Sequence, residues 1–356
     1  MTKPSNHNLP LPSFYNSQHA AESAFRPDQQ AIFELAAEWR KKHNIKFAGA
    51  DTYDLHLLGI DLQKDFCFPD GSLYVGGRDG QGAIDDNRRI AEFVYGNLDK
   101  IKNFTVTMDT HFAYQIFFAS FWTDSDGQAL APHTEITVEM IRSGSVQPNP
   151  AIAWWVCNGN YPWLLKQVEF YCDELEKAGK YKLYLWPPHA IIGSDGHALA
   201  GVVHECRLFH NFVRGVQSWT EIKGGNPLTE NYSVLRPEVQ MRHDGQPLAQ
   251  KNTRFIKTLF AADALAIVGQ AASHCVKSTI DDLLDEIIAQ DPALVKKVYI
   301  LSDCMSSVTV PDGQGGFIAD FTPQCEEALQ RFADAGMNIV NSTDAIADWP
   351  GITLKP

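Results

Sequence analysis

Hydrophobic positions fall into short apolar runs that alternate with longer amphipathic stretches. Short runs rich in Leu, Ile and Val are typical of buried strands, whereas apolar residues three or four positions apart predict helices. The runs predict strands over residues 55–60, 103–108, 182–186, 218–222, 264–269, 298–302 and 338–340. The amphipathic stretches predict helices over residues 84–98, 164–178, 202–213, 274–289 and 324–335.

This alternation predicts the fold class. Strands separated by helices require right-handed crossovers, which build a parallel sheet with helices on both faces. We therefore expect an α/β fold, a three-layer doubly wound and mostly parallel sheet. Ligands in such sheets bind beyond the carboxyl ends of the strands, so polar residues that directly follow the strands are the first candidates for a site.

Three segments interrupt the alternation. Residues 1–50 begin with coil-forming residues, and we expect an N-terminal extension with one helix from Pro27 to Lys42, packed on the body or on a neighbouring subunit. Residues 112–160 are rich in aromatic side chains, and residues 225–255 are polar and rich in Pro and Gly. We expect both to be insertions within one domain that spans residues 51–356.

Composition and charge exclude several classes of protein. A formal net charge of −13 argues against nucleic acid and anionic membranes as partners. No run of eighteen apolar residues predicts a transmembrane helix, and the first thirty residues lack the apolar core of a signal peptide. The seven cysteines are irregularly spaced and form no CxxC pair, which disfavours a disulfide framework or structural zinc. We expect a cytoplasmic protein.

Titratable residues follow several predicted strands. Asp61 follows the first strand and could act as a base, although a turn residue is the commoner explanation for such an aspartate. Asp109 and His111 follow the second strand as Asp-Thr-His, and His189 follows a later one. One carboxylate and two imidazoles suit a divalent transition metal, while each histidine alone is more often structural. Lys223 also follows a strand, where a lone lysine is usually a surface charge.

Cys275 lies between an apolar strand and the next helix. A thiol at a helix N-terminus lies at the positive end of the dipole, which favours thiolate, and free amides there can hold an oxyanion. A nearby Lys223 would lower the thiol pKa and keep Asp61 charged. Buried structural packing is the commonest state of free cysteine and explains the other six. His274 could pair with the thiol, but adjacent side chains on a helix diverge, which favours Asp61 as the base.

In their order along the chain, the segments that contain these residues resemble the nicotinamidase/pyrazinamidase branch of the isochorismatase-like cysteine hydrolases. The chain departs from that family in three places. It has a long insertion before the third metal ligand, Ser273 where relatives often have an acidic residue, and Gln270 where they have an aliphatic one. The matching segments are Asp61-Leu62-Gln63-Lys64-Asp65-Phe66, Asp109-Thr110-His111, Trp186-Pro187-Pro188-His189, Lys223-Gly224 with Tyr232-Ser233, and Gly269 to Val276.

The resemblance implies an isochorismatase-like hydrolase fold and a role for each matched residue. It implies a cis peptide bond before Ala271. The implied sets are a catalytic triad of Asp61, Lys223 and Cys275, oxyanion donors at the Ala271 and Cys275 amides, substrate walls at Phe66 and Trp186, and metal ligands at Asp109, His111 and His189.

The resemblance also implies an activity. We expect a nicotinamidase-like amidohydrolase that converts nicotinamide, or a similar small aromatic amide, to the carboxylic acid and ammonia through a thioester. One divalent ion is expected, with Zn first and Mn or Fe as alternatives. Aromatic residues of the first insertion would suit a subunit contact, so we expect a homo-oligomer. Three alternatives stay open: a hydrolase of a larger amide or ureide, a metal oxygenase, and a non-catalytic binding protein.

Overall fold

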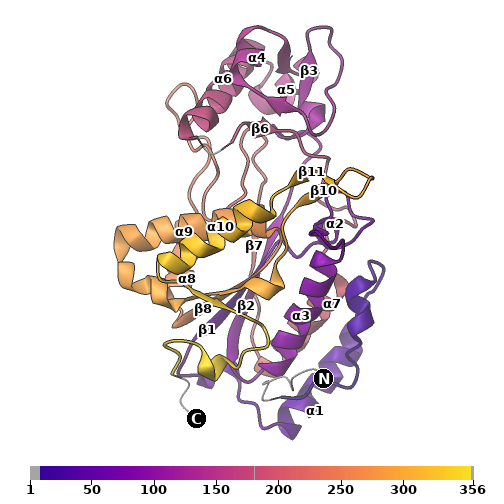
Figure 1. Cartoon of the computed structure of the whole chain (residues 1–356), viewed down its shortest axis with the longest axis vertical. Coiled ribbons are helices and arrows are strands. Elements are labelled where there is room, and N and C mark those ends of the chain that lie inside the picture. The colour runs from indigo at the N-terminus through magenta and orange to yellow at the C-terminus, as the bar shows by residue number, and fades with distance from the viewer. Residues whose placement is uncertain (1–8, 180, 354–356) are drawn as a thin grey trace.

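The computed structural model describes residues 9–179 and 181–353. Six parallel strands form the central sheet in the order β12-β9-β8-β1-β2-β7 (Figure 1). The predicted fold class, a doubly wound parallel sheet, is confirmed. The strands are β1 (Leu55–Ile60), β2 (Ile101–Asp109), β7 (Thr220–Lys223), β8 (Ala264–Gly269), β9 (Val298–Leu301) and β12 (Asn338–Val340).

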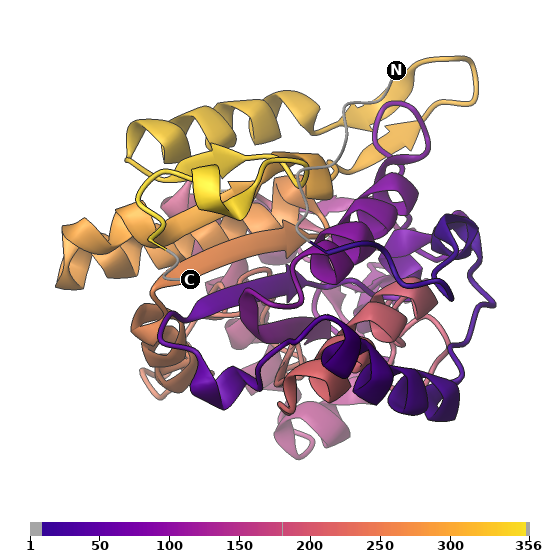
Figure 2. The ribbon, with the colours of Figure 1, turned by 90° about the horizontal axis from the view of Figure 1, so that it is seen from below.

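Helices cover both faces of this sheet (Figure 2). Alternate residues of a strand point to opposite faces, and in β1 the side chain of Leu57 joins one hydrophobic core while that of Leu58 joins the other. These two cores give the three layers expected from the sequence. The first core lies under α1 (Gln29–Lys42), α3 (Gly82–Gly96) and α7 (Gly201–Arg214), and the second under α8 (Thr253–Ala261), α9 (Lys277–Gln290) and α10 (Thr322–Asp334).

The N-terminal extension contains the predicted helix and packs on the body. Helix α1 begins after Asp28, whose carboxylate accepts hydrogen bonds from two amides of the first turn. Ile32 and Ala36 of α1 lie in the first core, and Phe33 contacts Phe212 of α7 at a ring-centroid distance of 5.2 Å. The body therefore covers the side of this helix that bears Ile32 and Ala36, whereas Phe33 stays 54% exposed. Short 3₁₀ turns lie on either side, η1 (Ser17–Ala21) and η2 (Ala48–Ala50).

A separate lobe follows β2 and lies beyond the sheet in Figure 1. It has its own hydrophobic core, which includes Trp122 and Leu164. Two short antiparallel strand pairs frame it, β3 with β5 and β4 with β6. Its elements are η3 (Ala119–Phe121), β3 (Trp122–Asp124), β4 (Glu135–Ile136), α4 (Val138–Arg142), β5 (Val146–Pro148), η4 (Pro150–Ile152), α5 (Ala153–Cys157), α6 (Tyr161–Ala178) and β6 (Leu183–Tyr184).

The lobe extends beyond residue 160, where the sequence pattern ended the insertion. The helix predicted over residues 164–178 forms, but as α6 it packs within the lobe and not on the sheet. The strand predicted over residues 182–186 shortens to β6 and pairs antiparallel with β4, so its placement in the parallel sheet was wrong. An apolar run shows that a strand is buried but does not show which partner it pairs with.

The remaining elements connect these parts. Residues 225–255 cross from the lobe to the body, because Leu228 belongs to the lobe core and Leu235 to the second core of the sheet. An antiparallel hairpin that the sequence analysis missed joins β10 (Thr309–Pro311) to β11 (Phe317–Asp320). Among the described residues, no helix is both long and apolar enough to cross a membrane. Further short helical turns are α2 (Lys64–Cys67), η5 (Ala272–Val276), η6 (Pro292–Lys297), η7 (Ser302–Cys304) and η8 (Ile346–Asp348).

Candidate active site

The register of the parallel sheet gathers the predicted site residues at one edge. In the β1–β8 pair Ile60 lies opposite Gly269, so Asp61 and the turn to Cys275 begin side by side. In the β2–β7 pair Asp109 lies opposite Lys223. Because neighbouring parallel strands end at the same edge, residues far apart in the sequence meet there.

Lys223 connects the two carboxylates and the thiol. Its Nζ lies 2.9 Å from Oδ2 of Asp61, 3.0 Å from Oδ1 of Asp109 and 3.5 Å from Sγ of Cys275. Nζ also donates to the carbonyl of Asn231 at 2.9 Å. The structure therefore brings the three residues of the predicted triad into one buried cluster.

Burial and charge oppose each other at these groups. Burial raises the pKa of the Cys275 thiol, the Lys223 ammonium opposes this rise, and the Asp61 carboxylate, hydrogen-bonded to the thiol, adds to it. Burial likewise raises the pKa of Asp61, against the attraction of Lys223. Lys223 thus acts on the thiol pKa in the expected direction, but burial has the larger effect, so the pKa of the Cys275 thiol lies well above its usual range. A neutral thiol becomes a strong nucleophile only when a base removes its proton, and the Asp61 carboxylate is the neighbouring base.

Local backbone structure fixes two of these side chains. Asp61 has a positive φ of 47°, which places its carboxylate beyond the strand end, and its amide donates to the hydroxyl of Thr107 at 3.0 Å. The same hydroxyl donates to Oδ1 of Asp61 at 2.5 Å. Gly224 follows Lys223 at a φ of 87°, and a Cβ there would lie 2.5 Å from the ring of His111. Only glycine fits this close approach.

Asp109, His111 and His189 form a buried cluster whose ligand atoms all lie within 4.8 Å of one another. Nε2 of His111 lies 2.7 Å and Nε2 of His189 3.6 Å from Oδ2 of Asp109. The Nδ1 atoms face backbone carbonyls instead, those of Gly224 at 3.2 Å and Pro187 at 2.8 Å. If each Nδ1 carries the proton, three lone pairs converge on one point, which is the donor set of a divalent cation site.

Charges around the cluster keep Asp109 ionised. Burial alone would raise the pKa of Asp109, but the neighbouring His111 and the Lys223 ammonium hold that pKa well below its usual range. Gln63 fixes the backbone at this point, because its Oε1 accepts from the Asp109 amide at 2.7 Å and its Nε2 donates to the Asp109 carbonyl at 2.8 Å. Asp65 accepts from the amide of Ala190 at 2.7 Å, next to His189. Gln63 and Asp65, two polar residues of the first matched segment, thus hold the backbone beside the candidate metal ligands.

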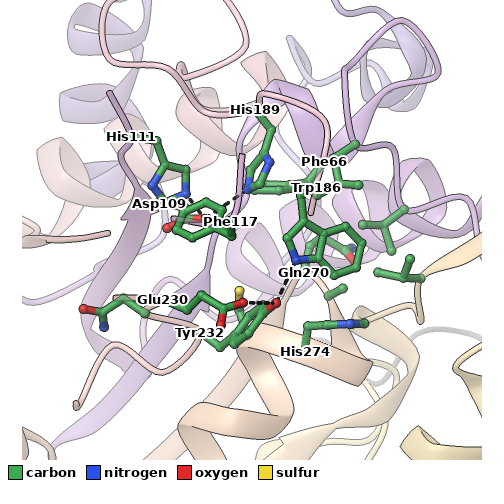
Figure 3. A pocket seen from close by; sticks show the side chains of 16 residues that line it. Phe66, Asp109, His111, Phe117, Trp186, His189, Glu230, Tyr232, Gln270 and His274 are labelled. Carbon is green, nitrogen blue, oxygen red and sulfur yellow. Dashed lines mark hydrogen bonds and ion pairs between the residues drawn. The ribbon is translucent and has the colours of Figure 1, made fainter. Parts of the chain in front are cut away.

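A cavity opens beside this cluster (Figure 3). Its empty volume is about 520 Å³, counting the part that is open to solvent. Phe66 and Trp186, the walls implied by the resemblance, both line it and are 6% exposed. Asp109, His111, His189 and Cys275 line the same space. The cavity thus offers aromatic walls beside the candidate nucleophile and the candidate metal ligands.

The turn that carries Cys275 has an irregular backbone. The bond between Gln270 and Ala271 is cis, as the resemblance implied. Cys275 lies in a π-helical turn, η5 (Ala272–Val276), and the regular helix α9 begins only at Lys277, three residues later than predicted. Ala271 and Cys275 both line the cavity, so the turn that bears the expected oxyanion donors borders it.

Sequence reasoning missed several residues that line the cavity. Phe117 comes from the inserted lobe, and His274 packs edge-on against Trp186 at a ring-centroid distance of 5.3 Å. Glu230 and Tyr232 come from the loop after β7. The aromatic content of the insertion and the Tyr-Ser match were visible in the sequence, but neither indicated that these side chains reach the cavity.

Comparisons with known proteins identify the fold. No protein-family model and no curated protein sequence matches the chain. Among solved structures, the yeast nicotinamidase Pnc1p bound to the inhibitor nicotinaldehyde is 18% identical, covers 81% of this chain and 99% of its own, and has a TM-score of 0.50. This match shows a shared fold. A second structure of Pnc1p is 20% identical over 81% of this chain and 99% of its own, with a TM-score of 0.49. A nicotinamidase/pyrazinamidase from Acinetobacter baumannii is 17% identical over 83% and 99%, with a TM-score of 0.48.

Proposed function

We propose that this chain is a nicotinamidase-like amidohydrolase of the isochorismatase-like type, which hydrolyses a small aromatic amide with Cys275 as nucleophile. The observation that carries the proposal is the contact of one buried ammonium, Lys223, with the Asp61 carboxylate at 2.9 Å and the Cys275 sulfur at 3.5 Å. A base, a nucleophile and a balancing charge in one cleft are the parts needed for acyl transfer. The fold shared with a yeast nicotinamidase is consistent with it.

The proposed reaction begins with proton transfer from the Cys275 thiol to the Asp61 carboxylate. The thiolate then attacks the carboxamide carbon, and the amides of Ala271 and Cys275 stabilise the oxyanion, where one such donor is typically worth about 3 kcal/mol. Protonated Asp61 gives its proton to the leaving ammonia, which leaves a thioester on Cys275. Water, deprotonated by Asp61, hydrolyses the thioester and restores the thiol. Lys223 offsets the charge that moves between these groups.

The residues beside the thiol fit a divalent metal ion. Two Nε2 atoms and one carboxylate oxygen converge, and both Nδ1 atoms have carbonyl partners that fix the rings. We propose that Asp109, His111 and His189 hold one such ion, with Zn first and Mn or Fe as alternatives. When bound, it would supply Lewis acidity at the wall of the cavity.

The lining of the cavity supports a flat aromatic substrate. Phe66, Phe117 and Trp186 present aromatic rings to the cavity, and Cys275 lines the same space. Because Phe117 and Trp186 come from the inserted lobe, a larger aromatic amide or ureide is the second candidate. The seven free cysteines suit a reducing compartment, so we propose a cytoplasmic enzyme. We propose a homo-oligomer from exposed aromatic residues of the lobe, such as Trp154 at 78% exposure.

An ammonia-release screen combined with metal analysis tests this proposal. Purified protein should release ammonia from nicotinamide and pyrazinamide, should contain about one divalent ion per chain, and should lose that ion in His189→Ala. A strict preference for bulky amides would favour the second candidate. No release from any amide would contradict the hydrolase, and consumption of oxygen that is indifferent to Cys275→Ala would indicate an oxygenase instead.

A further inference from the structure

Glu230 is a buried carboxyl in the cavity wall that the proposed reaction does not use. It is 2% exposed and lies in the loop after β7. Each of its oxygens accepts a separate hydrogen bond, Oε1 from the hydroxyl of Tyr232 at 2.9 Å and Oε2 from the hydroxyl of Tyr171 at 2.8 Å. The Glu230 amide also donates to the oxygen of Tyr171 at 3.0 Å. Because a buried carboxyl is costly unless its oxygens have partners, these bonds hold both rings in place.

The chain of hydrogen bonds continues to the substrate wall. Nε1 of Trp186 donates to the hydroxyl oxygen of Tyr232 at 2.7 Å (Figure 3). The Tyr232 hydroxyl is thus acceptor for the indole and donor to Glu230, so its orientation depends on both partners. The indole N–H is a donor only, which leaves Trp186 one direction in which to satisfy this bond.

The two ends of this relay come from the inserted lobe. Tyr171 lies on α6, and Trp186 follows β6, and both belong to the core of the lobe. Glu230 and Tyr232 lie on the loop that leaves the strand carrying Lys223. The relay therefore ties the lobe to the strand that carries the catalytic lysine, through one carboxyl. The ring of Tyr181, from the same lobe, packs edge-on against Tyr232 at a ring-centroid distance of 5.6 Å.

We propose that Glu230 is a positioning residue that, through Tyr171 and Tyr232, fixes the Trp186 indole against the aromatic ring of the substrate. The inserted lobe would thereby set the preference of the enzyme for flat aromatic amides. This inference rests on the proposed function for the identity of the substrate. The hydrogen bonds of the relay exist without substrate and can be tested without turnover.

Glutamine is the conservative replacement at this position. Burial and the nearby Glu238 raise the pKa of Glu230 to about 8, while the hydroxyls of Tyr171 and Tyr232 oppose the rise. A protonated carboxyl and a carboxamide each offer one acceptor and at least one donor, so Glu230→Gln can keep both tyrosines bonded. Glu230→Met has a similar shape and offers neither hydroxyl a good partner.

The kinetic test compares four variants. Glu230→Met and Tyr171→Phe should raise the KM for a small aromatic amide about tenfold with kcat within about twofold, because a buried hydroxyl or carboxyl oxygen loses its partner. Their KM for acetamide should stay unchanged, since it has no ring to contact Trp186. Glu230→Gln should keep a KM close to wild type. Tyr161→Phe is the matched control, because this α6 hydroxyl donates to the Pro148 carbonyl at 2.8 Å, within the lobe core.

A fluorescence measurement separates this inference from the proposed function. The emission of Trp186 is obtained as the difference between each protein and the same protein with Trp186→Phe. Glu230→Met and Tyr171→Phe should shift that emission, and Glu230→Gln and Tyr161→Phe should not. If wild type releases no ammonia, the proposed function fails while the emission still tests the relay. Wild-type KM and wild-type Trp186 emission in both Glu230→Met and Tyr171→Phe would overturn the inference.

Discussion

Lys223 is the residue on which the charge balance of the site depends. Its side chain is 2% exposed and pairs with Asp61 and Asp109, whose side chains are 0% and 7% exposed. Burial alone would lower the pKa of Lys223, but the two carboxylates hold it well above its usual range. The ammonium and the two carboxyl groups can stay buried here because each contacts a partner within the cluster.

Removing this ammonium should destabilise the fold. In metal-free protein, Lys223→Met should lower the free energy of unfolding by about 3–5 kcal/mol, because two buried carboxylates lose their common partner. Urea denaturation at pH 7 with a chelator measures this. Lys182→Met is the control, because Lys182 is half exposed and lies 4.0 Å from Glu135, and its effect should stay below about 0.5 kcal/mol. Equal losses in the two variants would contradict the role given to Lys223.

At this scale, sequence reasoning named the chemical groups but not their surroundings. Asp61, Lys223 and Cys275 could be singled out because each follows a strand, and parallel strands end at a common edge. The raised pKa of Cys275 could not be predicted, since it depends on how completely the lobe and loops exclude water. The role of Glu230 could not be predicted from the sequence. Its partner Tyr171 lies 59 positions away, and its partner Tyr232 lies two positions away in a loop without a regular pattern.

At the scale of secondary-structure elements, helix α3 contacts the turn after β8 through Asp86. Oδ2 of Asp86 accepts a hydrogen bond from Nε2 of Gln270 at 2.9 Å. Asp86 is 1% exposed, and burial raises its pKa to about 7, although hydrogen bonds from Gln270 and Ser306 and the charge of Arg89 oppose the rise. The family that the sequence resembles has an aliphatic residue at the position of Gln270, so this polar contact accompanies a departure from that family's pattern.

The raised pKa of Asp86 predicts a specific pH dependence of stability. The folded-state pKa lies above the ordinary value of 3.8, so the folded chain retains a proton that the unfolded chain has lost. The contribution is therefore complete below pH 3.8 and is lost as the pH rises through 7. Between pH 4 and 8, wild type should lose a few kcal/mol of unfolding free energy relative to Asp86→Asn, as measured by urea titrations. Parallel curves for the two proteins would refute a raised pKa.

The sequence pattern predicted the elements better than their partners. β1, β8 and β12 have the predicted bounds, and in β1 and β8 a continuous apolar run marks a fully buried strand. β6 was also seen as an extended run, yet it pairs antiparallel with β4 in the lobe. Pairing depends on contacts across the chain, which periodicity along the chain does not encode.

At the scale of the whole molecule, the lobe is an addition that shapes the site. The solved structure with a TM-score of 0.50 covers 81% of this chain but 99% of its own, so the added length belongs to this chain. Phe117 and Trp186, which belong to the lobe core, form part of the cavity wall. The composition of residues 112–160 indicated an insertion. Its end beyond α6 could not be predicted, because it depends on the packing of α6 in the lobe core and not on the sheet.

The measurement that tests the central claim most directly is ammonia release by Cys275→Ala beside Cys206→Ala. Cys206 is also fully buried, but it lies on α7, where its thiol donates to the Val203 carbonyl at 3.2 Å. We predict that Cys275→Ala lowers turnover of a small aromatic amide by roughly 10⁴-fold or more, with metal content and unfolding midpoint unchanged, whereas Cys206→Ala stays active. Turnover retained in Cys275→Ala would contradict the account.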